Sequence, residues 1–345
     1  MTDTWPSLLS ARGAQFDASG HARFERASAP ASVSLIPLLH EASILVAGAD
    51  AESFLQGQLS NDIRQITNTQ GQPAAYCTPK GRVLATFSIW PQEGGYVLRL
   101  PVELADRIRK RLQMYVLRSR VTLEAVSGHV ALLGLAGPGS VPLLEGLIGK
   151  APRSPFAIIQ ANGMSTMALP GQRIEIAVRP DSAAALWDGL AAAGAAAAAQ
   201  DVWDAGAIAA GAATVLAPTS DQFIPQMLNL ELTGAVAFDK GCYPGQEIVA
   251  RSQYRGQVKR RLYRFSSARP AQPGASIHTS DGAVAGTVVN VAQRPSGDYE
   301  LLAVASQRAG HDRLYADAEC TAPLRPVPLP YPVPESQAQS VTDGE

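Results

Sequence analysis

Short apolar runs separated by turn-forming residues predict that the first half of the chain alternates between strands and helices. Residues 44–46 are typical of a buried strand, and Asp50 is a candidate N-cap for a helix over 51–63. A Pro/Gly turn at 78–81 lies between two β-prone runs and predicts a hairpin over 74–90. A helix over 102–115 and a strand over 120–125 are expected to follow. The pattern therefore favours a mixed α and β architecture.

The pattern of residues 44–59 returns at 133–148, at an offset of 89 residues. Gly48 corresponds to Gly137, and Phe54 corresponds to Leu143. The similarity can arise by chance between two strand–turn–helix segments, or it can reflect two related α+β units. A repeat of this length is too long for a solenoid of stacked repeats.

The last part of the chain is expected to be rich in β-structure. Residues 173–179 alternate between apolar and charged side chains, which predicts a strand with one apolar and one polar face, and Asp181 is placed to cap the helix that follows. From residue 262 onward, β-prone runs separated by turns suggest a small antiparallel barrel or sandwich, with strands over 262–265, 276–278, 287–291, 299–304 and 319–321. Six prolines in 323–334 predict an extended, poorly ordered tail.

Composition narrows the class of protein. A length of 345 residues suggests two or three domains at about 150 residues each. Because Lys and Arg number 29 and Asp and Glu number 30, the overall field does not attract nucleic acid, and we expect no direct nucleic-acid binding. Three cysteines exclude a disulfide scaffold, and neither they nor the histidines have the spacing of a metal site. Without a targeting segment or a run of 18 apolar residues, a cytoplasmic protein without membrane contact is expected.

The densest group of polar residues lies between 221 and 264. Cys242 stands there in a turn between Gly241 and Gly245, close in sequence to Lys240 and Arg251. A neighbouring cation lowers the pKa of a thiol and makes it more reactive. The alternative is that Cys242 is a small buried apolar residue, as free cysteines often are, and for Cys77 and Cys320 this is the preferred interpretation. A helix or strand is expected to begin at residues 246–247.

A run of cations without an intervening acid follows the cysteine, at Arg251, Arg255, Lys259, Arg260, Arg261 and Arg264. It can be a solvated face, a site for the carboxylates of a ligand tail, or a contact for a nucleic-acid backbone. Templates for a dinucleotide site and a phosphate loop fail, and His40 is interpreted as an ordinary residue at a strand edge.

Several motifs carry a resemblance to a known family. Residues 240–247, KGCYPGQE, followed by Arg251, resemble the signature of the YgfZ-type folate-binding proteins, bacterial relatives of a mitochondrial factor that matures iron–sulfur proteins. Further matches lie in the block 222–226 with Asn229, at Gln58, Asn61 and Asp62, in the turn 80–82, and at Tyr115, Ser119 and Val121. The resemblance covers about residues 40 to 325.

This resemblance implies an α+β fold like that of the T-protein of glycine cleavage. Interleaved α/β domains are expected around a central hole, with an antiparallel β-barrel at the C-terminal end. The expected domains are 35–127 together with 221–258 for folate, 128–220 as a second α+β domain, 259–322 as the barrel, and 323–345 as the Pro-rich tail.

The resemblance also implies a function. It predicts a tetrahydrofolate-binding accessory factor for the assembly or repair of iron–sulfur clusters, whose client proteins include radical enzymes that modify tRNA. The alternative is a folate-dependent aminomethyl transferase. Cys242 is the candidate catalytic residue, no metal site is expected, and the candidate folate-binding residues are Lys240, Gln246, Glu247, Arg251, Asn229, Gln226, Asn61, Asp62 and Tyr115.

Two departures from the family pattern bear on these expectations. Ala209 stands where the family often carries an acid that suits the pterin ring. Residues 100–101 read Leu-Pro where aminomethyltransferases lead into a catalytic acid with Asn-Ala, and Asp106 does not align with that acid. The second departure argues against the transferase alternative.

Overall fold

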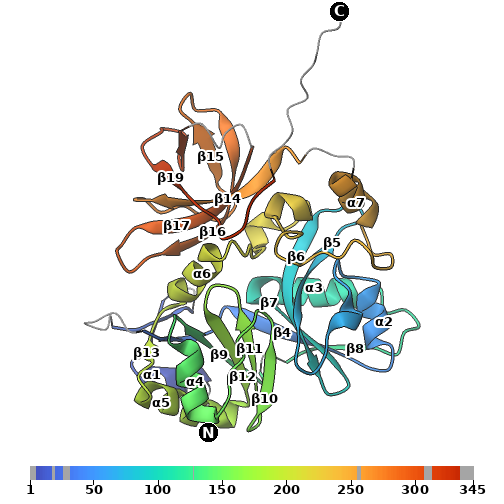
Figure 1. Cartoon of the computed structure of the whole chain (residues 1–345), viewed down its shortest axis with the longest axis vertical. Helices are drawn as coiled ribbons and strands as arrows, with labels where there is room; N and C mark the ends of the chain where they lie inside the picture. Colours follow the sequence, from blue (N-terminus) through green and yellow to red (C-terminus); the bar gives the residue numbers. More distant parts are fainter. Residues whose placement is uncertain are drawn as a thin grey trace, which may run out of the picture.

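The chain folds into two sheets with flanking helices and a barrel, grouped around a common centre (Figure 1). The computed structural model describes residues 5–17, 20–25, 32–126, 128–254, 258–306 and 313–334. The mixed α and β class and the closed antiparallel barrel are those predicted from the sequence.

The first sheet has five antiparallel strands in the order β5-β6-β7-β4-β8. The strands are β4 (Glu41–Ala47), β5 (Gln72–Cys77), β6 (Val83–Gln92), β7 (Gly95–Pro101) and β8 (Thr122–Ala125). The helix α3 (Val102–Gln113) buries Leu104, Ile108 and Leu112, a spacing of four residues that places one apolar stripe on the core. The expected hairpin over 74–90 is confirmed.

The helix expected over 51–63 is shorter in the structure. Helix α2 runs over Ala51–Gln56, and only a turn of 3-10 helix, η1 (Ile63–Gln65), follows it. Asp50 stands at the N-terminal boundary but does not cap the helix with its side chain. Its carboxylate instead accepts a hydrogen bond of 2.8 Å from the backbone N–H of Arg120, and so ties α2 to the approach to β8.

The second sheet has six strands in the order β10-β11-β12-β9-β3-β13. They are β3 (Ser34–Pro37), β9 (Ala131–Ala136), β10 (Ile158–Ala161), β11 (Met164–Leu169), β12 (Arg173–Val178) and β13 (Ala196–Ala197), with α4 (Ser140–Ile148) and α5 (Pro180–Ala192) packed against them. A short helix α1 (Trp5–Ser10) contacts α5, and β1 (Gln15–Phe16) pairs with β2 (Ala22–Arg23).

Both faces of β12 are buried, which the alternation at 173–179 did not predict. Arg173 and Glu175 were expected on a polar face, yet both are buried. The reason is that this face of the second sheet meets the first sheet, where Glu175 forms an ion pair with Arg99 of β7. Alternation along a strand therefore indicated two chemically different faces and not an exposed one.

The sequence pattern that returns at an offset of 89 residues corresponds to a repeated structural feature. Gly48 follows β4 and Gly137 follows β9, with φ angles of 126° and 121°. At each glycine a Cβ atom would lie within 2.5 Å of a backbone oxygen, that of Arg120 or of Ser32. The same constraint at matching positions favours the interpretation of two related α+β units.

The chain then returns to the first sheet. After α6 (Gln200–Ala209), residues 210–254, the return segment, carry η2 (Ala217–Thr219), η3 (Pro225–Leu228) and α7 (Gln246–Tyr254). Phe223 O accepts a hydrogen bond from Val83 N at 2.8 Å, and Ser60 O accepts one from Ala237 N at 3.0 Å. The apolar core of the first sheet includes Phe223, Leu228 and Val249.

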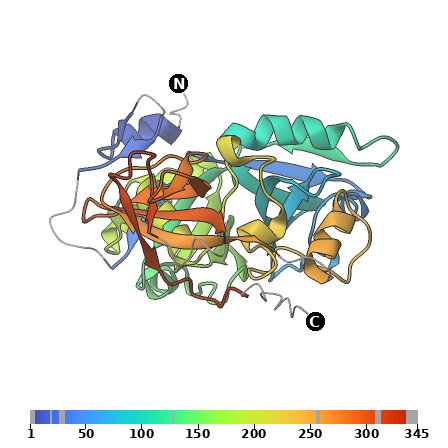
Figure 2. The same cartoon turned by 90° about the horizontal axis from the view of Figure 1, so that it is seen from above.

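The barrel closes in the order β14-β17-β16-β15-β18-β19. Its strands are drawn in orange to red in Figure 2. Its strands are β14 (Arg260–Ser267), β15 (Ser276–Thr279), β16 (Val284–Gln293), β17 (Tyr299–Ser306), β18 (Leu314–Tyr315) and β19 (Pro323–Val327). The strand expected over 319–321 is wrong. The closing strand lies in the Pro-rich stretch that was expected to be a tail, where Pro326 is the register partner of Phe265.

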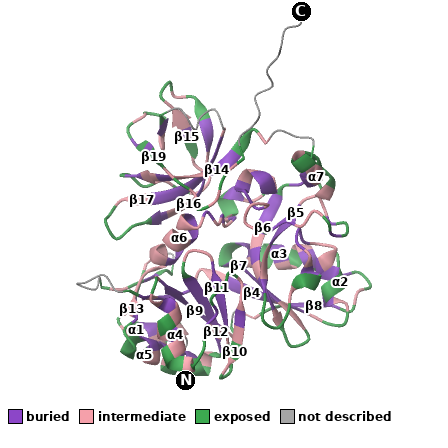
Figure 3. Cartoon of the chain, viewed as in Figure 1, coloured by how far each residue is buried: buried purple, intermediate pink, exposed green. Residues whose placement is uncertain are grey.

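The buried residues gather where strands face one another, and α7 lies near the surface of the molecule (Figure 3). The division into domains stays a prediction, with one difference at its start, because Ser34–Pro37 pairs with β9 of the second sheet. Within the described residues, no helix has the length and apolar character that a membrane crossing requires.

Candidate functional site

Lys240 holds the signature loop against the end of α2. Its ammonium group donates hydrogen bonds to the carbonyl oxygens of Gln56, Leu59 and Asn61 at 2.5–2.9 Å, and it lies 5.1 Å from the centre of the Tyr243 ring. Only 7% of the residue is exposed, and this burial lowers the pKa of the amine to about 8. Three carbonyl acceptors favour the charged form, so the ammonium group serves as a structural anchor.

Cys242 lies at the surface, in the loop that precedes α7. It is exposed, whereas Cys77 is buried in the first sheet and Cys320 is partly exposed. The interpretation of Cys242 as a buried apolar residue is therefore wrong. The ammonium group of Lys240 is held by backbone carbonyls, and Arg251 pairs with Glu247 at 3.0 Å. Activation of the thiol by these two cations stays a prediction.

The candidate amides Gln226 and Asn229 are fully buried and bind backbone groups. Gln226 Nε2 donates to Val249 O of α7 at 2.7 Å, and Asn229 Nδ2 donates to Leu262 O of β14 at 3.0 Å. Asn229 has a φ of 54°, which asparagine tolerates better than most residues. These amides fasten the return segment to α7 and to the barrel.

The other candidate residues lie at separate positions in the part of the molecule that is built around the first sheet. Asn61 Nδ2 donates to Pro73 O and Gly234 O at 2.7 and 2.8 Å, and Gln246 Nε2 donates to Lys240 O at 3.3 Å. Asp62 pairs with Arg64 at 2.8 Å, which lowers the pKa of the carboxyl to about 2. Tyr115 is exposed beyond the end of α3.

The run of cations after Cys242 does not form a continuous basic face. Arg261 is buried in an ion pair with Glu231, and Arg264 pairs with Glu300 at 2.7 Å. Arg255 lies outside the described residues. Lys259 and Arg260 are exposed. The buried ion pairs disfavour a nucleic-acid contact along the whole run.

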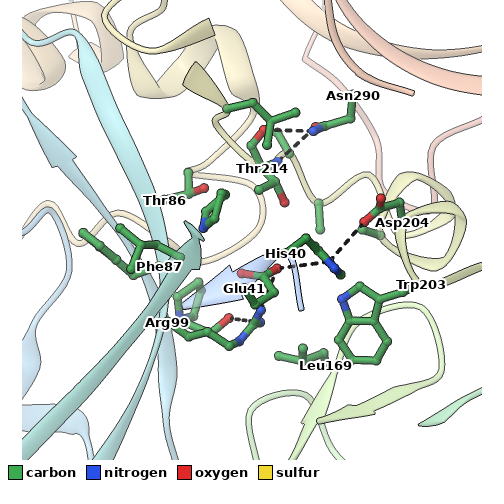
Figure 4. A pocket seen from close by; sticks show the side chains of 18 of the residues that line it. His40, Glu41, Thr86, Phe87, Arg99, Leu169, Trp203, Asp204, Thr214 and Asn290 are labelled. Atoms are coloured by element: carbon green, nitrogen blue, oxygen red, sulfur yellow. Dashed lines mark hydrogen bonds and ion pairs between the residues drawn. The ribbon is translucent and has the colours of Figure 1, made fainter. Parts of the chain in front are cut away.

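A cavity of about 330 Å³ lies at the centre, where the two sheets, α6, the return segment and the barrel meet (Figure 4). Its polar wall includes His40, Glu41, Thr86, Ser88, Arg99, Asp204, Thr214 and Asn290. None of the candidate site residues from the sequence, all of which the structure describes, lines this cavity. Cys242 therefore does not open into this cavity, and Lys240 anchors its loop on the carbonyl oxygens of Gln56, Leu59 and Asn61 instead.

A network of charged side chains closes one end of the cavity. Arg99 Nη1 lies 2.8 Å from Glu41 Oε1, and Arg99 Nε forms an ion pair with Glu175. His40 Nε2 lies 3.8 Å from Glu41 Oε1 and 3.9 Å from Asp204 Oδ1. The dashed lines in Figure 4 join Arg99 to Glu41 and His40 to both Glu41 and Asp204. The network thus connects the first sheet to the second sheet and to α6.

Burial changes the protonation of this network. It lowers the pKa of His40 to about 4, so the imidazole is neutral at pH 7. It raises the pKa of Asp204 to about 7, so that carboxyl is close to half ionised at neutral pH. It lowers the pKa of Arg173 to about 10, and that guanidinium stays charged while it lies 4.7 Å from the centre of the Trp203 ring. Perturbed groups in a cavity are typical of a functional site.

The sequence interpretation missed these residues. His40 was assigned to a strand edge, but its side chain is largely buried and lines the cavity. Arg99 carried a usable signal, since it is a charge between two leucines inside an apolar strand. The described residues contain no group of His, Cys, Asp and Glu able to hold a metal ion.

Comparisons with known proteins agree with this architecture. The family model of the GCVT N-terminal domain matches residues 11–211. The tRNA-modifying protein YgfZ of Klebsiella pneumoniae (strain 342) is 30% identical over 311 residues, which is 88% of this chain and 94% of that protein. The tRNA-modifying protein YgfZ of Escherichia coli O127:H6 is 29% identical over 316 residues, 90% of this chain and 96% of that protein.

A solved structure supports the fold over the whole length. The glycine cleavage system aminomethyltransferase T from Bartonella henselae superposes with a TM-score of 0.77 at 17% identity, over 95% of this chain and 97% of that one. At this identity the likeness concerns the fold. The sequence matches carry the family, and the chain belongs to the YgfZ family of proteins with a GCVT N-terminal domain.

Proposed function

We propose that this protein binds tetrahydrofolate in the central cavity and acts as an accessory factor in tRNA modification. In this role it supports the assembly or repair of iron–sulfur clusters in client enzymes. The name of the YgfZ relatives supports the link to tRNA, and the GCVT-type fold supports a folate ligand. The observation that carries the proposal is the cavity at the place where the first sheet, the second sheet and the barrel meet.

The cavity fits a folate in size and chemistry. A volume of about 330 Å³ lies within the usual range for small-molecule sites, roughly 300–1,000 Å³. Its walls combine apolar residues such as Phe87 and Leu169 with a few charged groups at one end. Two atoms at this end of the cavity, Glu41 Oε2 and His40 Nε2, are buried and have no hydrogen-bond partner among the described residues. Because unpaired buried polar atoms are costly, they favour a ligand with hydrogen-bonding groups at this end.

Bound tetrahydrofolate would supply two nitrogens that can carry a one-carbon group, N5 of the pterin ring and N10 of the bridging amine. The residues of this chain would enclose the pterin, exclude water and present hydrogen-bond partners. Whether the ligand is consumed decides between the accessory role and the aminomethyl transferase alternative. Asp106, which does not align with the transferase acid in the sequence, is exposed on α3, pairs with Lys110 at 2.7 Å and does not line the cavity. We therefore expect no turnover of an aminomethyl donor.

Filling the cavity is expected to abolish folate binding. Ala212 lines the cavity and is partly exposed, so a tryptophan there occupies ligand space without entering the apolar core. Ala212→Trp should lower the affinity for tetrahydrofolate by on the order of a hundredfold, measured by calorimetric titration under anaerobic conditions. The matched control is Ala217→Trp, at an exposed residue of the same segment that does not line the cavity. Equal affinities of both variants would place the folate elsewhere.

Cys242 is proposed to act as a reactive thiol in support of client enzymes. Its exposure makes it accessible to a partner protein, since it precedes α7 at the surface. In cells that lack the native gene, Cys242→Ala should reduce the level of the dependent tRNA modification several-fold, measured by mass spectrometry of digested tRNA. Cys320→Ser, in the barrel, serves as the control and should restore the modification. Full complementation by Cys242→Ala would remove the thiol from the mechanism.

A further inference from the structure

Asp204 is the one acid of the charged network whose carboxylate remains accessible from the cavity. It lies on α6, and 33% of its side-chain surface is accessible although protein surrounds it on most sides. Among the described residues, only Gln200 donates a hydrogen bond to it, from Nε2 to Oδ2 at 3.0 Å. The other oxygen, Oδ1, lies 3.9 Å from His40 Nε2, which is beyond hydrogen-bond distance.

The other charged groups of the network each have a partner, although Glu41 Oε2 is left without a hydrogen bond among the described residues. Glu41 and Glu175 both pair with Arg99. Arg173 Nε donates to Pro170 O at 3.0 Å, and its guanidinium lies over the Trp203 ring. A carboxylate offers about four lone-pair positions, and Asp204 uses one of them. Asp204 therefore has spare acceptor capacity on both oxygens, and it lines the cavity.

Helix α6 directs Asp204 to the cavity. Trp203, Ala207 and Ala210 of the same helix region also line the cavity, so this face of α6 forms its wall. Ala209 does not line it, and its carbonyl oxygen accepts a weak hydrogen bond from Arg264 Nη1 at 3.5 Å. The acid presented by this helix to the cavity is thus Asp204, five residues before Ala209.

We propose that Asp204 recognises the 2-amino-4-oxopyrimidine edge of the ligand, its two carboxylate oxygens accepting the adjacent ring N–H and exocyclic amino N–H groups. This inference rests on the proposed function and adds the group that orients the ligand. A carboxylate that faces two parallel N–H donors forms a fork of two hydrogen bonds, the geometry by which carboxylates bind guanidinium groups. Such a fork discriminates against a ligand that lacks one of the two donors, because a buried acceptor is then left unpaired.

The ionisation of Asp204 supports a pH dependence of binding. Burial raises the pKa of the Asp204 carboxyl to about 7, and the fork requires the ionised form. Between pH 6 and pH 8 His40 stays neutral and Arg173 stays cationic, whereas burial also raises the pKa of Glu175, which pairs with Arg99 and does not line the cavity, to about 7. Asp201 lies one turn earlier on α6, and His21 lies at the exposed rim of the cavity. The affinity of the wild-type protein should therefore rise about tenfold from pH 6 to pH 8. The same pH series with Asp204→Asn separates the two carboxyls, since only the contribution of Asp204 is lost in that variant.

The experiment compares two ligands and three proteins by anaerobic calorimetric titration at pH 8. The ligands are tetrahydrofolate and its 2-desamino-2-methyl analogue, which lacks the exocyclic donor. The proteins are the wild type, Asp204→Asn, and the control Asp201→Asn, whose carboxylate accepts from the backbone N–H of Gln293 at 3.1 Å and does not line the cavity. We expect Asp204→Asn to lose roughly 30-fold in affinity for tetrahydrofolate and to bind the analogue like the wild type.

Three results would overturn the inference. Unchanged tetrahydrofolate affinity of Asp204→Asn would show that the carboxylate makes no contact with the donors. Equal losses for both ligands would mean that the substitution acts through the structure of the cavity and not through the amino edge. If the wild type binds neither ligand, folate binding itself fails, and the proposed function fails with it. Binding of the analogue by Asp204→Asn also demonstrates that the variant is folded.

Discussion

Arg99→Met is expected to lower the free energy of unfolding by about 3–5 kcal/mol. Arg99 is buried between Glu41 of its own sheet, at 2.8 Å, and Glu175 of the second sheet. Methionine has a similar length but no charge, so both largely buried carboxylates lose the cation that compensates them. Urea unfolding followed by tryptophan fluorescence measures the change, since Trp90 and Trp203 lie in the core between the two sheets.

Two comparisons separate the buried charge from other effects of the substitution. Arg64→Met removes an exposed guanidinium that also pairs with a carboxylate, that of Asp62, and should change stability little. Adding Glu175→Gln to Arg99→Met removes one uncompensated charge and should recover part of the loss. Stability of Arg99→Met within 1 kcal/mol of the wild type would argue against a network that links the two sheets.

Lys240→Met should lower the free energy of unfolding by about 3 kcal/mol. The substitution leaves the carbonyl oxygens of Gln56, Leu59 and Asn61 without their shared donor, and unpaired buried acceptors cost about 1–3 kcal/mol each. Part of that cost is relieved when the loop moves and admits water. The same urea titration measures the loss, and the exposed Lys110 provides the control substitution Lys110→Met.

The loop itself provides a second measurement for this variant. Tyr243 packs beside the ammonium group, and Cys242 precedes it. If Lys240 is the anchor of the loop, Lys240→Met should increase the rate at which a thiol reagent labels Cys242. An unchanged labelling rate together with unchanged stability would show that other contacts hold the loop.

Local patterns in the sequence predicted much of the fold for a simple reason. The hairpin over 74–90 and most barrel strands depend on turns and β-prone runs that are neighbours in the chain. The closing strand β19 was missed because proline is depleted in strands, whereas Pro326 and Pro323 are accommodated at the seam of the barrel. The length of α2 was overestimated because the apolar spacing continues through Leu59 and Ile63, whereas the helix ends at Gln56 and the N–H of Ile63 donates to the side-chain oxygen of Gln56.

The cavity could not be predicted in the same way. Arg99 and Glu175 lie 76 residues apart and meet only because two sheets face one another. Asp204 is an ordinary acid on a helix until the barrel and the return segment enclose it. The signature motif, in contrast, drew attention to Lys240. Its partners are backbone carbonyls, which every residue carries, so the sequence does not reveal them. A conspicuous motif thus marked a structural joint, and inconspicuous residues formed the cavity.

The return segment has a consequence for biosynthesis. β8 ends at Ala125, but Val249, which belongs to the core of the first sheet, leaves the ribosome 124 residues later. At about 5–20 residues per second, the apolar face of the first sheet stays uncovered for on the order of ten seconds while the residues of the second sheet are synthesised. The nascent first unit is consequently a natural substrate for chaperones, and a chain cut in the middle should yield an N-terminal fragment that aggregates.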